Sequence, residues 1–569
     1  MSRREAWLSA LGIFTLALAV RVLAARAVVF PIPEDTAYYY GVARNLIEGR
    51  GLVSDALWSY ATPPLVLPRP AFEIWLPLPT LLIAPLMAVA GSTDFRIAQV
   101  VPVVAGALVP VLAWRLAADL ASERNLPSGR ARTLALGVGV TAAVELPLVL
   151  HSTLPDSTIL FAALALAAVL LMERITREAR HVPTPDPHLL GLGALLGLAA
   201  LTRNEAAWLA LTWVVIAWTM PPRAWPGRQT TGGSAGGVGA NETQSAGRSV
   251  PGDRLRLIAI PAAVALAIYG PWAVRDWAVF GSPFPGQAVT NALFVTGFDV
   301  FAWQDPPTLG RYLAQGWPSI IQAHLDGLIH NLVNVLLVPS FPVGLIGLVA
   351  LPWTAIRSAR ALRPLLLVSM LTFLVTSLVF PVATTWGTFL HAAGPVQVLL
   401  LVSSLVGLDA LIARIGRIRG WTRPVAWLGP ALTASIAGLF SLSVGGFGAQ
   451  SADVAGRYAA LTPVLEAIGA DHGRAGPVIT DFPIWFAEAQ DGPALGLPDE
   501  PPASVLDLAR RFGARYLIIS DDDRGRWPAI LRSGQPGAEC FRPVPLGPAA
   551  DPDAAAALAG TRVWEIVCR

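Results

Sequence analysis

Lysine is absent from the 569-residue sequence, so arginine supplies all 41 basic side chains. Only 14% of the residues are charged and 54% are hydrophobic, whereas soluble domains carry about 25% charged residues. This composition excludes an ordinary soluble protein and indicates that lipid is the main solvent of the chain. The formal net charge of +3 is too small for the length of the chain to indicate binding of nucleic acid.

Cysteine is almost as scarce, because only Cys540 and Cys568 occur and both lie near the C-terminus. Two cysteines supply neither a metal-binding framework nor a redox motif. In an oxidising compartment they can form a disulfide, and in a reducing one they stay as thiols. The sequence leaves both alternatives open.

Long hydrophobic runs are what the sequence has in abundance. The first run, from Trp7 to Val29, is too long for the core of a signal peptide and is predicted to be a retained span. Because a span needs roughly 20 mostly apolar residues, we predict about eleven spans. They cover residues 7–29, 97–119, 133–152, 157–173, 189–202, 205–220, 257–274, 327–356, 364–382, 391–413 and 424–446.

Arginine-rich connections occur at alternate ends of these predicted spans. Because positively charged loops stay in the cytoplasm, the N-terminus is predicted to be cytoplasmic and the C-terminus extracytoplasmic. Residues 74–91 are also apolar, but they contain three prolines, and a span there would move several basic loops outside. We therefore interpret this segment as an interfacial helix on the outer leaflet.

The predicted fold is mainly α: a polytopic transmembrane helical bundle over residues 1–449, with a small extracytoplasmic α/β domain over residues 450–569. The bundle includes a long outer loop at 30–96. A Gly-, Ser- and Pro-rich segment at 221–255 is predicted to be a disordered cytoplasmic linker. In the tail, predicted strands at 477–481, 515–520 and 562–568 alternate with predicted helices at 504–514 and 551–560.

Several ionisable residues lie beside span ends on the predicted outer face. Such residues are costly at a membrane margin and are functional candidates by default. An arginine can bind a lipid phosphate, and a carboxylate can take a proton from an attacking hydroxyl group. The candidates are Asp35, Arg69, Asp156, Arg203, Glu205, Arg275 and His391.

Residues 33–44, PEDTAYYYGVAR, resemble the first outer loop of GT-C glycosyltransferases. This superfamily includes the dolichyl-phosphate-mannose protein mannosyltransferases and the lipid A aminoarabinose transferases. Its pattern is Asp-Glu-x-x-Tyr followed closely by a helix with an Ala-Arg pair. Aligned on that pair, Asp35 takes the place of the catalytic aspartate and Tyr39 that of the tyrosine. Glu34 supplies the neighbouring acid, so the choice of base between Glu34 and Asp35 stays open.

Four further segments resemble features of the same superfamily and follow in the same order. Arg69-Pro70 resembles its Lys-Pro-Pro interfacial helix, and the Leu-Pro-Asp sequence ending at Asp156 resembles its second acidic position. The Leu-Thr-Arg sequence ending at Arg203 resembles its Leu-Thr-Lys turn. Residues 269–283 resemble a recurrent feature of its bacterial members, which implies an integral protein of a bacterial plasma membrane.

The resemblance implies a polyprenyl-phosphate-linked sugar donor and transfer with inversion to an extracytoplasmic glycan, lipid or protein. Polytopic transport or flipping, and ligation of whole glycans, are the alternative functions. A divalent cation is the one cofactor considered, with Asp35 and Asp156 as its ligands. The expected catalytic residues are Asp35, Glu34 and Asp156, and the expected substrate-binding residues are Tyr39, Arg69, Arg203, Glu205, Arg275 and His391.

Overall fold

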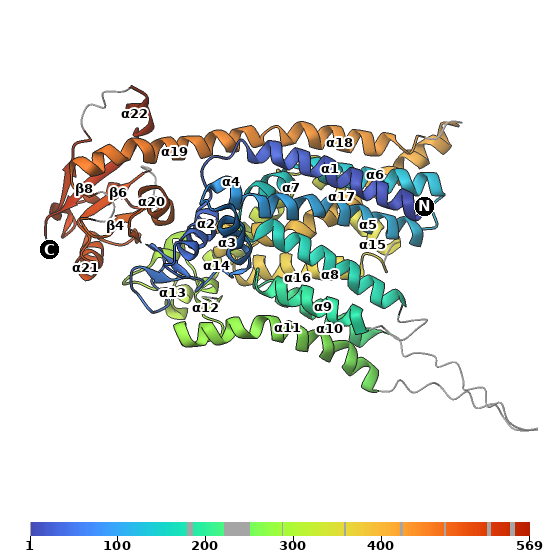
Figure 1. Cartoon of the computed structure of the whole chain (residues 1–569), viewed down its shortest axis with the longest axis horizontal. Coiled ribbons are helices and arrows are strands. Elements are labelled where there is room, and N and C mark those ends of the chain that lie inside the picture. Colours follow the sequence, from blue (N-terminus) through green and yellow to red (C-terminus); the bar gives the residue numbers. More distant parts are fainter. Residues whose placement is uncertain are drawn as a thin grey trace, which may run out of the picture.

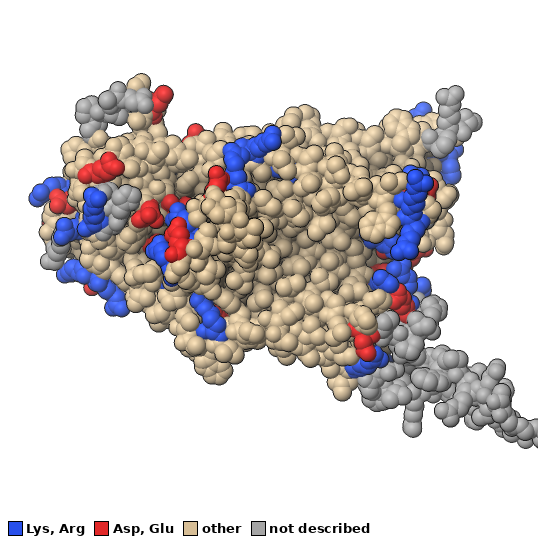
Figure 2. Space-filling view, in the orientation of Figure 1, with Lys and Arg blue, Asp and Glu red and all other residues tan. Residues whose placement is uncertain are grey.

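The computed structural model is a long helical bundle that carries a small sheet at one end (Figure 1). It describes residues 2–178, 186–220, 251–286, 288–357, 360–421, 425–470, 474–520, 525–546 and 552–568. Figure 2 shows, on the visible face of the bundle, a wide band of mostly uncharged surface between a zone of charged side chains near the sheet and a zone of basic side chains at the far end. This distribution fits a protein that crosses a membrane.

The bundle consists of long apolar helices. They are α1 (Arg3–Ala25), α5 (Val100–Glu123), α6 (Ser128–Val144), α8 (Thr158–Glu178), α9 (Asp186–Ala200), α10 (Ala206–Thr219), α11 (Pro251–Phe280), α15 (Val343–Arg357), α16 (Arg363–Val379), α17 (Gly394–Ile418) and α18 (Leu428–Ser441). Within the described residues, seven helical stretches are long and apolar enough to cross a membrane, or eight if the bent stretch from Ser128 to Thr153 is one span. Several shorter apolar helices accompany them. The chain is an integral membrane protein, and the count of eleven spans stays a prediction.

Shorter elements gather at the end of the bundle that faces the sheet. They are α2 (Glu34–Ile47), α3 (Leu78–Ala90), α4 (Phe95–Ala98), α7 (Leu146–Leu150), α12 (Ala288–Ala292), α13 (Leu309–Ala314) and α14 (Trp317–Ile329), with the 3₁₀ turns η1 (His151–Thr153), η2 (Gly297–Phe301), η4 (Ala383–Trp386) and η5 (Leu390–Ala392). The segment predicted to be an interfacial helix contains α3, which begins after Pro77 and ends before Gly91.

The structure corrects the predicted span at 327–356. Helix α14 continues through a π-helical segment (His330–Leu337), and α15 begins only at Val343. The break contains Pro339 and Pro342. Proline has no backbone N–H and disfavours helical geometry in the residue before it, so one straight helix cannot pass through this segment.

The segment 221–255, predicted to be a linker, overlaps a helix at its C-terminal end. Residues 221–250 lie outside the described residues, whereas Pro251 already begins α11. The end of the predicted linker was therefore wrong. Proline is favoured in the first turn of a helix because its missing N–H would have no partner there.

The tail begins with a helix that leaves the bundle. Helix α19 (Val444–Ala467) follows α18 and reaches the sheet, so the predicted domain boundary at 449/450 falls inside it (Figure 1). The predicted strands are present as β4 (Val478–Thr480), β6 (Tyr516–Ile519) and β8 (Arg562–Ile566), and the predicted helices as α21 (Pro502–Phe512) and α22 (Pro552–Ala557). Cys540 and Cys568 form a disulfide.

The sheet also contains elements that the sequence pattern did not predict. Its strand order is β2-β5-β4-β6-β8-β7, with β5 at Ala494–Gly496 and β7 at Phe541–Val544. Strand β2 (Ala56–Leu57) comes from the first outer loop and pairs parallel with β5. A second, two-stranded sheet within that loop joins β1 (Val53–Ser54) to β3 (Arg69–Pro70). The outer loop and the tail therefore share one backbone hydrogen-bond network.

Candidate functional site

A cavity of about 550 Å³ lies where the first outer loop, the α9–α10 turn and the η4–η5 segment meet. Its walls carry many aromatic side chains, and its polar groups come from segments far apart in the sequence. The polar lining includes Glu34, Asp35, Tyr39, Glu73, Arg203, Asn204, Glu205, Asp276 and His391. Concave sites with aromatic walls and a few convergent polar groups are typical ligand-binding sites.

Asp35 and His391 form the central polar pair of this cavity. Asp35 lies in the first turn of α2, and its Oδ2 is 3.0 Å from His391 Nε2. The other ring nitrogen, Nδ1, lies 2.7 Å from Thr158 Oγ1 at the start of α8. The imidazole is thus held at both nitrogens and is aimed at the carboxylate, which is the more exposed partner (24% against 8%).

Two opposing effects set the charge of His391. Burial lowers the pKa of the imidazole, but the adjacent Asp35 carboxylate outweighs burial and raises the pKa above its ordinary value of 6.5. His391 therefore stays protonated beside Asp35 up to a higher pH than a free histidine would.

The raised pKa predicts a stability change with pH. A histidine of this kind stabilises the fold fully below pH 6.5, and its contribution is lost as the pH rises through the raised pKa. We expect the thermal unfolding midpoint of the purified protein to fall across this window, measured by scanning fluorimetry. His391→Gln should flatten that fall, while His324→Gln, outside the cavity, should leave it unchanged. An equal fall in the His391→Gln variant would contradict the ion pair.

Arg203 and Glu205 form a second polar pair in the α9–α10 turn. The guanidinium donates to both carboxylate oxygens of Glu205, at 3.1 and 2.9 Å, and also to Ser157 Oγ at 2.9 Å. Both side chains are largely buried, at 11% and 7% exposure, and both line the cavity. Tyr39 lines the same cavity and is fully buried. A guanidinium at a cavity wall can bind a phosphate bidentately.

Glu34 lines the cavity but points to the tail. Its Oε1 accepts a hydrogen bond of 3.1 Å from the backbone N–H of Ile484, in the first turn of α20 (Pro483–Gln490). Further along α2, Arg44 donates to Glu488 of α20 at 3.0 Å. The tail therefore covers α2, and the two neighbouring acids have different surroundings: Asp35 faces a histidine, whereas Glu34 caps a helix.

Asp156 is buried behind the cavity wall. Its Oδ1 accepts from the backbone N–H of Thr158 at 2.7 Å, which is a helix-capping contact at the start of α8. Burial raises the pKa of this carboxyl group, and the nearby His391 partly offsets the effect. Thr158 connects Asp156 to the Asp35–His391 pair. We therefore place Asp156 beneath the site, where it supports the imidazole.

Two predicted substrate ligands lie away from the cavity lining. Arg69 is fully buried within the first outer loop, where it pairs with Glu73 at 3.4 Å and donates to the carbonyl oxygens of Ser59 and Thr62. Arg275 pairs with its neighbour Asp276 at 2.9 Å, and its guanidinium lies over the ring of Trp272. The structure brings Glu34, Asp35, Tyr39, Arg203, Glu205 and His391 together and leaves these two arginines outside the group.

Some cavity residues gave no signal in the sequence. Trp75 and Trp386 belong to the walls, and Glu73 and Asp276 add carboxylates. Tryptophans of membrane proteins usually belong to an interfacial belt, so Trp75 and Trp386 carry no cavity signal in the sequence. In the described parts of the chain, no group of three His, Cys, Asp or Glu side chains is arranged to hold a metal ion, so a divalent cation stays a prediction.

The overall fold is shared with solved structures of membrane proteins. No family model and no curated protein sequence matches the chain. Among solved structures, it resembles ArnT from Cupriavidus metallidurans bound to undecaprenyl phosphate (TM-score 0.56, 13% identity, 99% of this chain and 98% of that one). It also resembles the apo oligosaccharyltransferase from Archaeoglobus fulgidus (TM-score 0.55, 14% identity, 95% of this chain and 73% of that one). The predicted likeness to the fold of the lipid A aminoarabinose transferases is thereby confirmed.

Proposed function

We propose that the chain transfers a sugar from a polyprenyl-phosphate-linked donor to an extracytoplasmic acceptor, with inversion at the anomeric carbon. The observation that carries the proposal is the Asp35–His391 pair, 3.0 Å apart, inside a cavity that also contains Arg203. The fold adds support, because the similar ArnT structure holds undecaprenyl phosphate. The acceptor is a glycan, a lipid or a protein outside the cytoplasm.

The proposed reaction needs one base and one phosphate-binding group. The acceptor hydroxyl attacks the anomeric carbon, the bond from that carbon to the phosphate oxygen breaks, and polyprenyl phosphate leaves as an anion. Asp35 takes the hydroxyl proton, and the imidazolium of His391 holds the carboxylate in place. Arg203 binds the phosphate and stabilises the charge that develops on it. Tyr39 positions the donor, and Glu205 holds the guanidinium of Arg203 in place.

The proposal also includes the orientation of the chain in the membrane and the compartment that the tail faces. Helix α2, which carries Asp35, lies at the end of the bundle next to the tail sheet (Figure 1), whereas basic side chains gather at the opposite end (Figure 2). Because arginine-rich loops stay in the cytoplasm, the site and the tail face outward. The disulfide between Cys540 and Cys568 supports an oxidising compartment for the tail. A bacterial plasma membrane is the location that we propose.

The kind of donor that the protein consumes distinguishes the proposed sugar transferase from a glycan ligase and from a flippase. Protein reconstituted in nanodiscs would be given either a polyprenyl monophosphate monosaccharide or a polyprenyl pyrophosphate oligosaccharide, each with a crude envelope acceptor fraction. We expect free polyprenyl phosphate to be released from the first donor, measured by mass spectrometry. Release of polyprenyl pyrophosphate from the second donor alone would show a glycan ligase. If neither donor releases its carrier, the protein is reconstituted into vesicles, where movement of intact donor from one leaflet to the other would show a flippase.

A further inference from the structure

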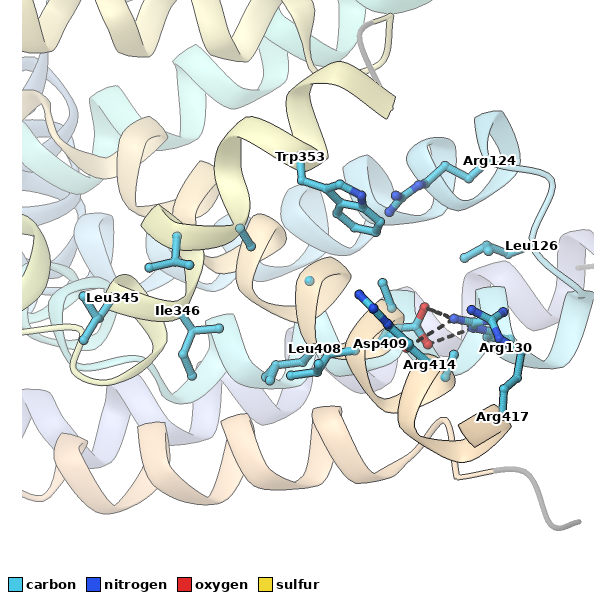
Figure 3. A pocket seen from close by; sticks show the side chains of 16 residues that line it. Arg124, Leu126, Arg130, Leu345, Ile346, Trp353, Leu408, Asp409, Arg414 and Arg417 are labelled. Atoms are coloured by element: carbon cyan, nitrogen blue, oxygen red, sulfur yellow. Dashed lines mark hydrogen bonds and ion pairs between the residues drawn. The ribbon is translucent and has the colours of Figure 1, made fainter. Parts of the chain in front are cut away.

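A second cavity lies at the arginine-rich end of the bundle, between α15 and α17 (Figure 3). Its volume is about 1020 Å³, and the end of α5 and the start of α6 complete its wall. None of its lining residues belongs to the candidate active site. It is therefore a separate feature that the proposed transfer reaction does not use.

One part of this groove is apolar and open to the surroundings of the bundle. Its walls include Leu345, Val349 and Leu411, and Val349 is 76% exposed. The helices meet at the floor, where a Cβ added to Gly407 would lie 2.5 Å from the Cβ of Ala350. Small side chains therefore form the floor of a slot with apolar rims. A slot of this kind in the membrane region accommodates an acyl chain.

The other part of the groove is strongly basic. Figure 3 shows four arginines, Arg124, Arg130, Arg414 and Arg417, at one end, whereas Leu345 and Ile346 lie at the other. Among the described residues, Asp409 is the only acid in the lining. Arg130 already neutralises it, because the guanidinium donates to the two carboxylate oxygens at 2.8 and 2.7 Å.

Arg414 and Arg417 have no acidic partner among the described residues that line the groove. Arg414 and Arg417 are exposed, and within the described ranges neither makes a hydrogen bond or an ion pair. The guanidinium of Arg124 lies over the ring of Trp353, 4.6 Å from its centroid. A cation over an aromatic ring keeps its charge, so the basic end carries excess positive charge.

We propose that this groove binds an anionic phospholipid from the leaflet at the arginine-rich end. The phosphodiester and the anionic headgroup would lie between Arg414, Arg417 and Arg124, and an acyl chain would lie along Val349 and Leu411. A zwitterionic lipid carries its own cation, which the arginines repel. Free phosphate has no apolar part to occupy the slot. Both parts of the groove therefore select the same ligand, since basic pockets between membrane helices bind anionic headgroups.

Lipid titration followed by native mass spectrometry tests this site on the full chain. The probes are phosphatidylglycerol, which is anionic, and phosphatidylcholine, which is zwitterionic. The wild type should prefer phosphatidylglycerol. Arg414→Gln with Arg417→Gln should lower that affinity by about 30-fold, because each arginine near a membrane surface contributes about a factor of five. Val349→Trp should lower it without any change of charge, because the larger side chain fills the slot.

The matched control removes two charges from the same end outside the groove. Arg4→Gln with Arg419→Gln changes two exposed arginines that do not line the cavity, and it should leave the preference intact. An equal loss in the control would overturn the proposal, because the general charge of this end would then attract the lipid. Unchanged affinity in the Arg414/Arg417 variant, or in Val349→Trp, would also overturn it.

Discussion

Replacing Asp35 by Asn should lower the rate of sugar transfer by about 10²–10⁴-fold, the usual contribution of a positioned general base. The amide has the size and shape of the carboxylate, and its oxygen can still accept a hydrogen bond from His391, 3.0 Å away. The variant should therefore fold and bind the donor as the wild type does. Single-turnover transfer, with donor binding measured separately, distinguishes a lost base from a lost site.

Glu34→Gln is the matched control for this experiment. Its side-chain oxygen can still accept the hydrogen bond from the Ile484 N–H, so the contact between α2 and the tail should persist. We expect this variant to keep most of its activity. If Glu34→Gln is inactive while Asp35→Asn transfers at the wild-type rate, Glu34 is the base and our assignment is wrong by one residue. If both variants are fully active, the first outer loop does not supply the base.

Replacing Arg203 by Gln should have two separable effects. It leaves the Glu205 carboxylate, only 7% exposed, without its ion-pair partner. Removing one member of such a buried pair typically costs about 3–5 kcal/mol in the free energy of unfolding. It also removes the proposed phosphate ligand, which should weaken donor binding by about 1.5–3 kcal/mol, the contribution of a hydrogen bond to a charged group. Thermal unfolding and donor titration measure the two effects independently.

The double variant Arg203→Gln with Glu205→Gln separates structure from function. Neutralising Glu205 removes the unpaired buried charge, so most of the stability should return. Donor affinity should remain low, because neither amide replaces a guanidinium at a phosphate. If the double variant binds the donor as tightly as the wild type, Arg203 only balances Glu205, and another group must hold the phosphate.

The sequence located the parts of the site that local patterns can identify. The motif at residues 33–44 and the short runs ending at Asp156 and Arg203 lie where chain segments leave the bundle, and the structure places all three at or beside one cavity. His391 was a weaker candidate because no acidic residue or motif in its own segment indicates what the imidazole binds. Its partner Asp35 lies far away in the sequence, beside the end of the first span, and only folding brings the two side chains to 3.0 Å.

The position of Arg69 in the sequence did not predict the direction of its side chain. Arg69 has a sequence position that suits a headgroup or phosphate contact, but its guanidinium turns inward to Glu73 and to two loop carbonyl oxygens. Sequence position gives the segment in which a side chain begins and does not give the direction in which it points. The direction depends on which buried polar groups need a partner, because an unpaired buried charge is costly.

The sequence by itself determined that this protein is a bundle of apolar helices with an α/β tail, because run length, arginine placement and residue alternation are local properties. Only the tertiary structure decided that β2, from residues 30–96, joins the tail sheet, that Glu34 caps α20 while Asp35 meets His391, and that a basic groove lies at the opposite end of the bundle. Two-residue strands and side-chain pairs carry no periodic signal. They form because segments distant along the chain satisfy each other's hydrogen bonds and charges once the helices have packed.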